Sequence, residues 1–243
     1  MFTADSQVKT KTTLKPDSYF LHRISLRPLL PGAGEKDLIE SCQQIYQIGE
    51  TRFMNFLHQQ DLAPMWSKAL HSASNTALVS DIFIETLRQS RLLATASYML
   101  QSQALKEIKL TLENENIIHV VFKGCHIRES IYDEPDVRPA YDIDILISLD
   151  DQIKAIQALV NAGYQFDPNA ENISHETTLY KGGISIDLHW DIMRPGRTRI
   201  PMTEILLKTR KEFPTHWGFN NEASLFLMLV HPVFTKYSTT PYS

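Results

Sequence analysis

The sequence feature that most constrains the fold is Asp142–Ile147 (DIDILI), an apolar run that carries two carboxylates one residue apart. Successive side chains of a β-strand point to opposite faces, so Asp142 and Asp144 share one face and the isoleucines share the other. Two adjacent carboxylates repel each other, and burying them without a partner is costly. A divalent cation removes that conflict, because Mg²⁺ typically takes one or two carboxylates together with phosphate oxygens. The segment predicts a strand with a candidate metal site; the alternative is a pair of solvated strand-end carboxylates.

A second acidic strand favours the metal interpretation. The segment Ile184–Trp190 (ISIDLHW) alternates in the same way, with apolar residues on one face and Ser185, Asp187 and His189 on the other. If the two strands are neighbours, Asp187 completes a cluster of three carboxylates that could hold two metal ions. Such a pair of ions clamps the attacking and leaving oxygens of an in-line phosphoryl displacement.

Composition indicates an ordinary globular protein, since 43% of the 243 residues are hydrophobic and 21% are charged. The formal net charge of −4 gives no general attraction to nucleic acid, so a polymer partner would need a local basic patch such as Arg194, Arg197 and Arg199. The two cysteines, Cys42 and Cys125, exclude a disulfide framework and a cysteine-rich zinc site. Without an apolar signal core or a membrane-spanning run, we expect a cytoplasmic protein and no membrane partner.

The first half of the chain predicts helices. Residues 1–18 are polar and rich in Lys and Thr, which is typical of a flexible N-terminal arm. Apolar residues at helical spacing then predict a helix over Glu35–Gln60 and another after Pro64. The stretch Thr76–Glu113 predicts one very long helix or two helices joined by a kink.

The pattern changes after Asn116. The β-branched run Ile117–Phe122 predicts a buried strand, and a short helical segment begins at Lys123-Gly124. Gly124 lets the backbone approach a ligand, the following amides point at an anion, and Lys123 offers a positive charge to phosphate. The alternative is a strand-to-helix turn with a solvated lysine. The sequence also leaves two interpretations of Arg138 open: a contact with phosphate or with the carboxylates, or a structural role.

The remaining segments predict alternating elements. Ser148–Asp151 ends the acidic strand and caps a helix from about residue 150 to Ala162, which Gly163 stops. Thr177–Tyr180 and Ile184–Trp190 form a β-hairpin. Further helices are expected over two segments, Thr203–Lys211 and Asn221–Val230, the second with Asn221 as its cap.

The ordered set Lys123-Gly124, Tyr132, Arg138, Asp142–Ile147 and Asp187–Trp190 resembles the uncharacterised nucleotidyltransferase family of the DNA polymerase β-like nucleotidyltransferase superfamily. The resemblance is strongest over Val120–Trp190. It implies an α+β fold with a helical N-terminal half followed by a small mixed β-sheet nucleotidyltransferase core flanked by helices. We accordingly expect, after the arm, a helical region over 19–115, the core over 116–200 and a C-terminal helical region over 201–243.

By the same resemblance, the chain is expected to be a metal-dependent nucleotidyltransferase that moves a nucleoside monophosphate from an NTP, ATP above others, to a hydroxyl acceptor and releases pyrophosphate. Asp142, Asp144 and Asp187 would be the catalytic metal ligands for two Mg²⁺ ions, with Mn²⁺ as the alternative ion. Nucleotide-binding roles fall to four residues: Lys123, Gly124, Arg138 and His189. The acceptor stays open among a small molecule, a protein hydroxyl and an RNA end.

Two departures from the resembled pattern leave alternatives. The superfamily usually has Gly-Ser after its first strand, where this chain has Lys123-Gly124, and the family usually continues into a longer helical region than the residues after Leu225 allow. Because Gly-Ser is absent, an inactive nucleotide-binding or regulatory module of the same fold is a second hypothesis. The second departure leads us to expect a C-terminal helical region that is truncated or naturally shortened. A glycosyltransferase that binds a metal–nucleotide-sugar complex through Asp-x-Asp is a third, although it requires an α/β half before the motif.

Overall fold

The structure is a computed structural model that describes residues 18–72, 78–166, 175–193 and 199–235. The chain divides into two compact units, Met1–Arg88, the helical unit, and Gln89–Ser243, the sheet unit. Residues 1–17 of the predicted N-terminal arm lie outside the described residues. The predicted boundaries at 18, 115 and 200 stay predictions. In the described part of the chain, every helix is too short or too polar to span a bilayer.

The helical unit packs short helices around one apolar core that includes Phe53 and Trp66, both fully buried. Trp66 donates from its ring nitrogen to the Ser25 carbonyl at 2.8 Å, which ties the first helix to the fourth. The elements are α1 (Ser18–Leu26), η1 (Arg27–Leu29), α2 (Glu35–Ile48), α3 (Glu50–Gln59), α4 (Ala63–His71) and the start of α5 (Asp81–Asn114).

The predicted helix over Glu35–Gln60 is wrong at one residue, because α2 and α3 are separate helices. Gly49 lies between them with a φ of +93°, a backbone conformation that glycine adopts without the steric penalty of a side chain. Its amide still donates to the Ile45 carbonyl at 2.9 Å, which closes the last turn of α2. Apolar spacing on both sides of Gly49 stays helical, so periodicity alone did not reveal the break.

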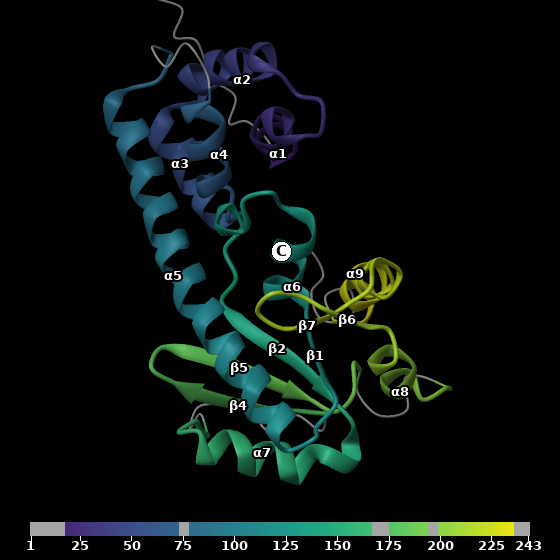
Figure 1. Cartoon of the computed structure of the whole chain (residues 1–243). Helices are drawn as coiled ribbons and strands as arrows, with labels where there is room; N and C mark the ends of the chain where they lie inside the picture. The colour runs from purple at the N-terminus through teal and green to yellow at the C-terminus, as the bar shows by residue number, and fades with distance from the viewer. Residues whose placement is uncertain (1–17, 73–77, 167–174, 194–198, 236–243) are drawn as a thin grey trace, which may run out of the picture. The chain divides into compact units, whose positions relative to one another are not determined.

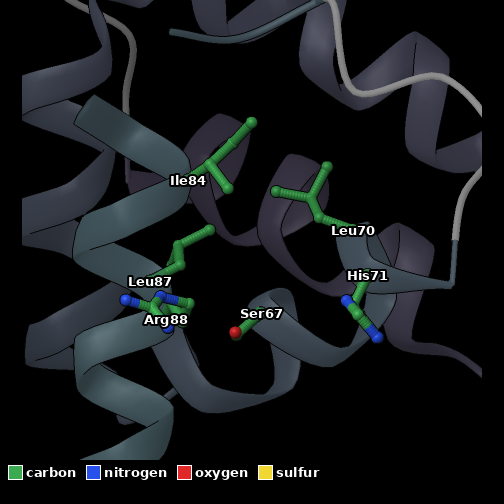
Figure 2. A pocket seen from close by; sticks show the side chains of 6 residues that line it. All are labelled: Ser67, Leu70, His71, Ile84, Leu87 and Arg88. Carbon is green, nitrogen blue, oxygen red and sulfur yellow. The ribbon is translucent and has the colours of Figure 1, made fainter. Parts of the chain in front are cut away.

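A pocket in the helical unit lies between α4 and α5 (Figure 2). Figure 2 shows Leu70 of α4 and Ile84 and Leu87 of α5 around one space. Arg88 at its edge is paired with Glu85, with nitrogen–oxygen distances of 2.8 and 3.0 Å. The predicted carboxylates Asp142, Asp144 and Asp187 all lie in the sheet unit.

The sheet unit is built on one seven-stranded mixed sheet with the strand order β3-β4-β5-β2-β1-β7-β6 (Figure 1). The pairs β2–β5 and β1–β7 are parallel and the others are antiparallel. The strands are β1 (His119–Phe122), β2 (Asp142–Ile147), β3 (Gln165–Phe166), β4 (Glu176–Lys181), β5 (Ile184–His189), β6 (Arg210–Glu212) and β7 (Trp217–Phe219). The predicted fold class, a helical half followed by a mixed sheet flanked by helices, is confirmed.

Helices cover both faces of this sheet. The isoleucines of β2 pack with residues of α5 and α7 (Gln152–Asn161) in one apolar cluster. On the other face, Phe122 and Leu146 pack with residues of α8 (Met202–Leu207) and α9 (Asn221–Thr235). Asp142 and Asp144 alternate with the isoleucines, so they lie on the second face of the sheet, at the N-terminal end of β2.

The predicted β-hairpin is confirmed. Strands β4 and β5 pair antiparallel, from Lys181↔Ile184 next to the turn to Glu176↔His189 at the open end. The connecting residues Gly182 and Gly183 have φ values of +57° and +88°. Positive φ at both central residues is typical of the tight turn that matches the twist of a two-residue hairpin.

Two predictions near the C-terminal end are wrong in detail. The helix predicted over Thr203–Lys211 ends at Leu207, and the chain continues into β6, whose side chains are all exposed. Because a short polar strand has neither apolar alternation nor β-branched residues, its sequence gives no strand signal. The cap of α9 is Asn220 rather than Asn221, since Asn220 Oδ1 accepts a hydrogen bond from the Ala223 amide at 2.9 Å.

Side chains of α5 hold the loop that leads into β2. Arg91 contacts Glu134 at 2.6 Å and Asp136 at 3.1 Å, and Thr95 donates to Asp136 at 2.6 Å. Further along α5, the Gln101 amide donates to the Ala140 carbonyl at 2.9 Å, two residues before β2 begins. These contacts fix where the acidic strand starts.

Two histidines form a buried pair beside β7. His126, in α6 (Lys123–Ile131), and His216 are 1% and 0% exposed, and their ring nitrogens lie 3.2 Å apart. Burial lowers the pKa of His126 to about 4. Burial, followed by the charge of His126, lowers the pKa of His216 to about 3. Both rings are therefore neutral in the folded protein at neutral pH.

The pair predicts acid sensitivity. The unfolded chain binds protons on these histidines below its ordinary pKa of 6.5, whereas the folded chain binds them only near 4 and 3, so the free energy of unfolding falls as pH falls through this window. We expect His216→Gln to reduce the loss of unfolding free energy between about pH 7 and about pH 5 by on the order of 1–2 kcal/mol. Chemical denaturation at both pH values measures this. The exposed control His71→Gln should leave the loss unchanged, and an equal loss in His216→Gln would contradict the prediction.

Gly218 of β7 is required by the same packing, because a Cβ there would lie 2.3 Å from the His126 ring and 3.0 Å from the Phe213 ring. We expect Gly218→Ala to lower the free energy of unfolding by about 1–3 kcal/mol. In a His126→Ala background the loss should be smaller, since the main clash is gone. Equal losses in the two backgrounds, measured by chemical denaturation, would refute this account.

Candidate active site

The structure brings the three predicted carboxylates to neighbouring strands. Strands β2 and β5 pair parallel, and the register sets Asp144 directly opposite Asp187 and Asp142 opposite Ser185. The two acidic strands are therefore neighbours, which is the condition under which Asp187 joins Asp142 and Asp144. Like charges directly opposite each other in a sheet are destabilising, so this register needs compensating groups nearby.

Asp144 is compensated by two nitrogen donors. It is 2% exposed, and its Oδ1 lies 2.5 Å from Lys123 Nζ and 3.0 Å from His189 Nε2. Burial by itself would raise the pKa of this carboxyl, but the hydrogen bond from His189 and the charge of Lys123 outweigh burial and hold the pKa below its ordinary value. Asp144 is therefore a buried, ionised carboxylate.

Lys123 reaches Asp144 because of where β1 ends. Phe122, the last residue of β1, is paired with Asp144, so the next residue lies beside the carboxylate. Lys123 takes a φ of +54°, an unusual value for a residue with a side chain, and begins α6 there. Its ammonium also lies 5.1 Å from the centre of the Phe122 ring. The predicted strand-to-helix turn at Lys123-Gly124 is confirmed, and the lysine is an ion-pair partner there.

The negative charges of Asp142 and Asp187 are less fully neutralised by neighbouring groups than that of Asp144. Burial, followed by the charges of Asp144 and Asp187, raises the pKa of Asp142. Burial also raises the pKa of Asp187, although Thr178 donates to its Oδ1 at 2.7 Å. For both carboxylates, burial and neighbouring negative charge outweigh the positive charge of Lys123 at Asp142 and of His189 at Asp187.

The donor set fits a hard divalent cation. Asp142, Asp144 and Asp187 offer carboxylate oxygens, which Mg²⁺ and Mn²⁺ prefer. Among the described residues, Asp144, Asp187 and His189 place ligand atoms within 4.8 Å of one another. Asp142 lies two residues before Asp144 in β2, on the same face of the strand. The shortage of positive charge at Asp142 and Asp187 is what a bound cation would relieve.

Glu176 is a residue of this site that sequence reasoning missed. Its Oε2 lies 2.8 Å from His189 Nδ1, so His189 bridges two carboxylates, Asp144 and Glu176. The same bridging raises the pKa of His189 against the opposing effect of burial. The signal was present, because a two-residue Gly182-Gly183 turn fixes a hairpin register in which Glu176 faces His189.

Gly124 and Arg138 lie close to each other. Arg138 Nη1 approaches the carbonyls of Gly124 at 3.5 Å and Pro139 at 3.4 Å. A Cβ at Gly124 would lie 3.2 Å from Ala140 Cβ, so a larger residue there would press on the loop before β2.

Of the arginines expected as a basic patch, Arg199 is exposed, and Arg194 and Arg197 lie outside the described residues.

With this geometry established, the chain is assigned to a family: it belongs to the uncharacterised nucleotidyltransferase family, whose sequence model matches residues 47–237. The family that the ordered residues resemble is thereby confirmed. A comparison with curated proteins found no match.

A comparison with solved structures found a likeness to the crystal structure of ANT(2″)-Ia in complex with adenylyl-2″-tobramycin. The two chains are 12% identical, the likeness covers 58% of this chain and 82% of that chain, and the TM-score is 0.42. A TM-score this low is too weak to bear on the site or its substrates.

The ion pair predicts a measurable role for Lys123 in stability. Lys123→Met keeps an aliphatic stem but removes the ammonium, which leaves the buried Asp144 with His189 alone. We expect the free energy of unfolding of the metal-free protein to fall by about 1–3 kcal/mol, as measured by chemical denaturation. The exposed control Lys208→Met should change it by less than about 0.5 kcal/mol. Equal effects of the two substitutions would show that the ion pair contributes nothing.

Proposed function

We propose that the chain is a metal-dependent nucleotidyltransferase that moves a nucleoside monophosphate from an NTP, with ATP as the first candidate donor, to a hydroxyl acceptor with release of pyrophosphate. The observation that carries the proposal is the parallel register of β2 and β5, which gathers Asp142, Asp144 and Asp187 beside Lys123. Membership of a nucleotidyltransferase family supports the transferase class.

Asp142, Asp144 and Asp187 would hold the divalent cations, Mg²⁺ first and Mn²⁺ as the alternative. When bound, these ions supply positive charge to the triphosphate and lower the pKa of the acceptor hydroxyl. Residues of the chain then position the reactants, which in phosphoryl transfer accounts for most of the catalysis.

Lys123 is proposed to contact the triphosphate. Its side chain is 30% exposed while its ammonium neutralises Asp144, so it has access to solvent and a flexible stem. With a cation held by Asp144, the Lys123 ammonium would be free to bind phosphate oxygens. The amides that follow Gly124 at the start of α6 lie at the positive end of a helix dipole and favour the same anion.

Asp187 is proposed to accept the proton of the acceptor hydroxyl. In the reaction, the hydroxyl oxygen forms a bond to the α-phosphorus, the bond from that phosphorus to the pyrophosphate oxygen breaks, and the hydroxyl proton passes to a carboxylate. Asp187 lies opposite Asp144 on β5 and is only partly buried, so its carboxylate can contact the acceptor hydroxyl. Arg138 and His189 keep nucleotide-binding roles as predictions, although His189 is 3% exposed and is bonded to two carboxylates.

A second candidate function has one observation in its favour. Lys123 and His189 already neutralise Asp144 without any cation. A nucleotide-binding or regulatory module that has lost transferase activity would need no more than this. Such a module would bind triphosphate without releasing pyrophosphate in the presence of any acceptor.

Calorimetric titration of the protein with ATP and the other NTPs, with and without Mg²⁺, tests the proposal. We expect Mg²⁺-dependent binding in the micromolar range, about −8 kcal/mol, that weakens at least about tenfold in Asp142→Asn/Asp144→Asn, because both metal ligands lose their charge. The exposed carboxylate variant Asp150→Asn is the matched control and should bind like the wild type. Absence of NTP binding by the folded wild-type protein would overturn the proposal.

A further inference from the structure

Three potential metal ligands gather at the open end of the β4–β5 hairpin. His175, Glu176 and His189 each offer one ligand atom, and these atoms lie within 4.8 Å of one another. Glu176 Oε2 is the centre of the group, at 2.8 Å from His189 Nδ1 and 3.6 Å from His175 Nε2. Two imidazoles and one carboxylate are a different donor set from the carboxylate oxygens of the proposed active site.

The backbone accounts for this convergence. Glu176 and His189 are paired across the two strands, so their side chains lie on the same face. His175 precedes β4 and is free of the alternation that would send it to the opposite face. Its carbonyl accepts a hydrogen bond from the Trp190 amide at 3.0 Å, which holds it beside the end of β5.

The second nitrogen of His189 supports a metal-binding role for the first. Nε2 lies 3.0 Å from Asp144 Oδ1, an arrangement that metal-binding histidines commonly use to fix ring orientation and tautomer. The ring is thereby held with Nδ1 toward Glu176 and His175. The side chain of His189 is 4% exposed, whereas those of His175 and Glu176 are 12% and 21% exposed, so the group opens toward solvent on the Glu176 side.

We propose that His175, Glu176 and His189 bind a divalent transition metal ion of the zinc type, at a site separate from the carboxylate oxygens of Asp142 and Asp187. Imidazole nitrogen suits zinc-type ions, whereas Mg²⁺ prefers oxygen ligands. Two histidines and one glutamate are a complete protein ligand set for a zinc site that keeps a fourth position for water or substrate. The inference goes beyond the proposed function and does not depend on it.

Such a site would join the first residues of β4 to the last residue of β5 and hold the ring that supports Asp144. The competing interpretation has no metal: Glu176 simply accepts a hydrogen bond from His189, and His175 takes no part. The two interpretations differ at His175, which is a ligand in the first and dispensable in the second.

The test uses Co²⁺ as a spectroscopic probe, with displacement by Zn²⁺, on the full-length protein without an affinity tag. We expect about one equivalent of Co²⁺ to bind in excess Mg²⁺, with visible absorption bands of a nitrogen- and oxygen-liganded ion that Zn²⁺ abolishes. His175→Gln should weaken binding at least about tenfold, since one of three ligands is lost. The exposed histidine control His71→Gln should bind Co²⁺ like the wild type.

Asp142→Asn separates this inference from the proposed function. It removes an oxygen ligand of the proposed active site and should leave Co²⁺ binding unchanged, whatever its effect on NTP binding. His175→Gln is used in place of His189→Gln because His175 is partly exposed, whereas a substitution of the buried His189 can prevent folding. Thermal unfolding of each variant checks that it is folded. The proposal is overturned if the wild type binds no Co²⁺, if His175→Gln binds it equally well, or if Asp142→Asn abolishes binding.

Discussion

The structure depends on one electrostatic conflict, the placement of Asp144 directly opposite Asp187 on adjacent parallel strands. Sheet register allows no partial shift, because a slip by one residue would turn every isoleucine of β2 out of the core. The apolar cluster formed with α5 and α7 therefore fixes the two carboxylates beside each other. Three nearby side chains offset the repulsion between these carboxylates. Lys123 after β1 and His189 at the end of β5 contact Asp144, and Thr178 donates to Asp187.

The three carboxylates are not neutralised to the same extent, and this difference sets the chemistry of the site. Asp144 receives two nitrogen donors and stays ionised in a buried position, whereas Asp142 and Asp187 have raised pKa values. Under the proposed function, these two carboxylates would gain from the charge of a bound cation, and Lys123 would be free to turn toward phosphate.

Sequence reasoning predicted the features that follow from local pattern. Alternation gave β2 and β5, the Gly182-Gly183 turn gave the hairpin, and Gly163, with a φ of +94°, stops α7 as expected. It missed features set by tertiary context: the exposed strand β6 has no apolar pattern, and the histidine pair joins residues 90 positions apart. Glu176 is intermediate, because its place follows from the hairpin register but its partner becomes clear only when His189 is buried between two carboxylates.

The backbone at Lys123 shows a trade-off between local conformation and charge. A φ of +54° costs a residue with a side chain about 1–2 kcal/mol relative to the right-handed region, and glycine would not bear this cost. The chain instead places its glycine one residue later and keeps an ammonium at the strained position. Conformational strain and electrostatic stabilisation thus meet in a single residue, the first of α6, whose ammonium neutralises Asp144.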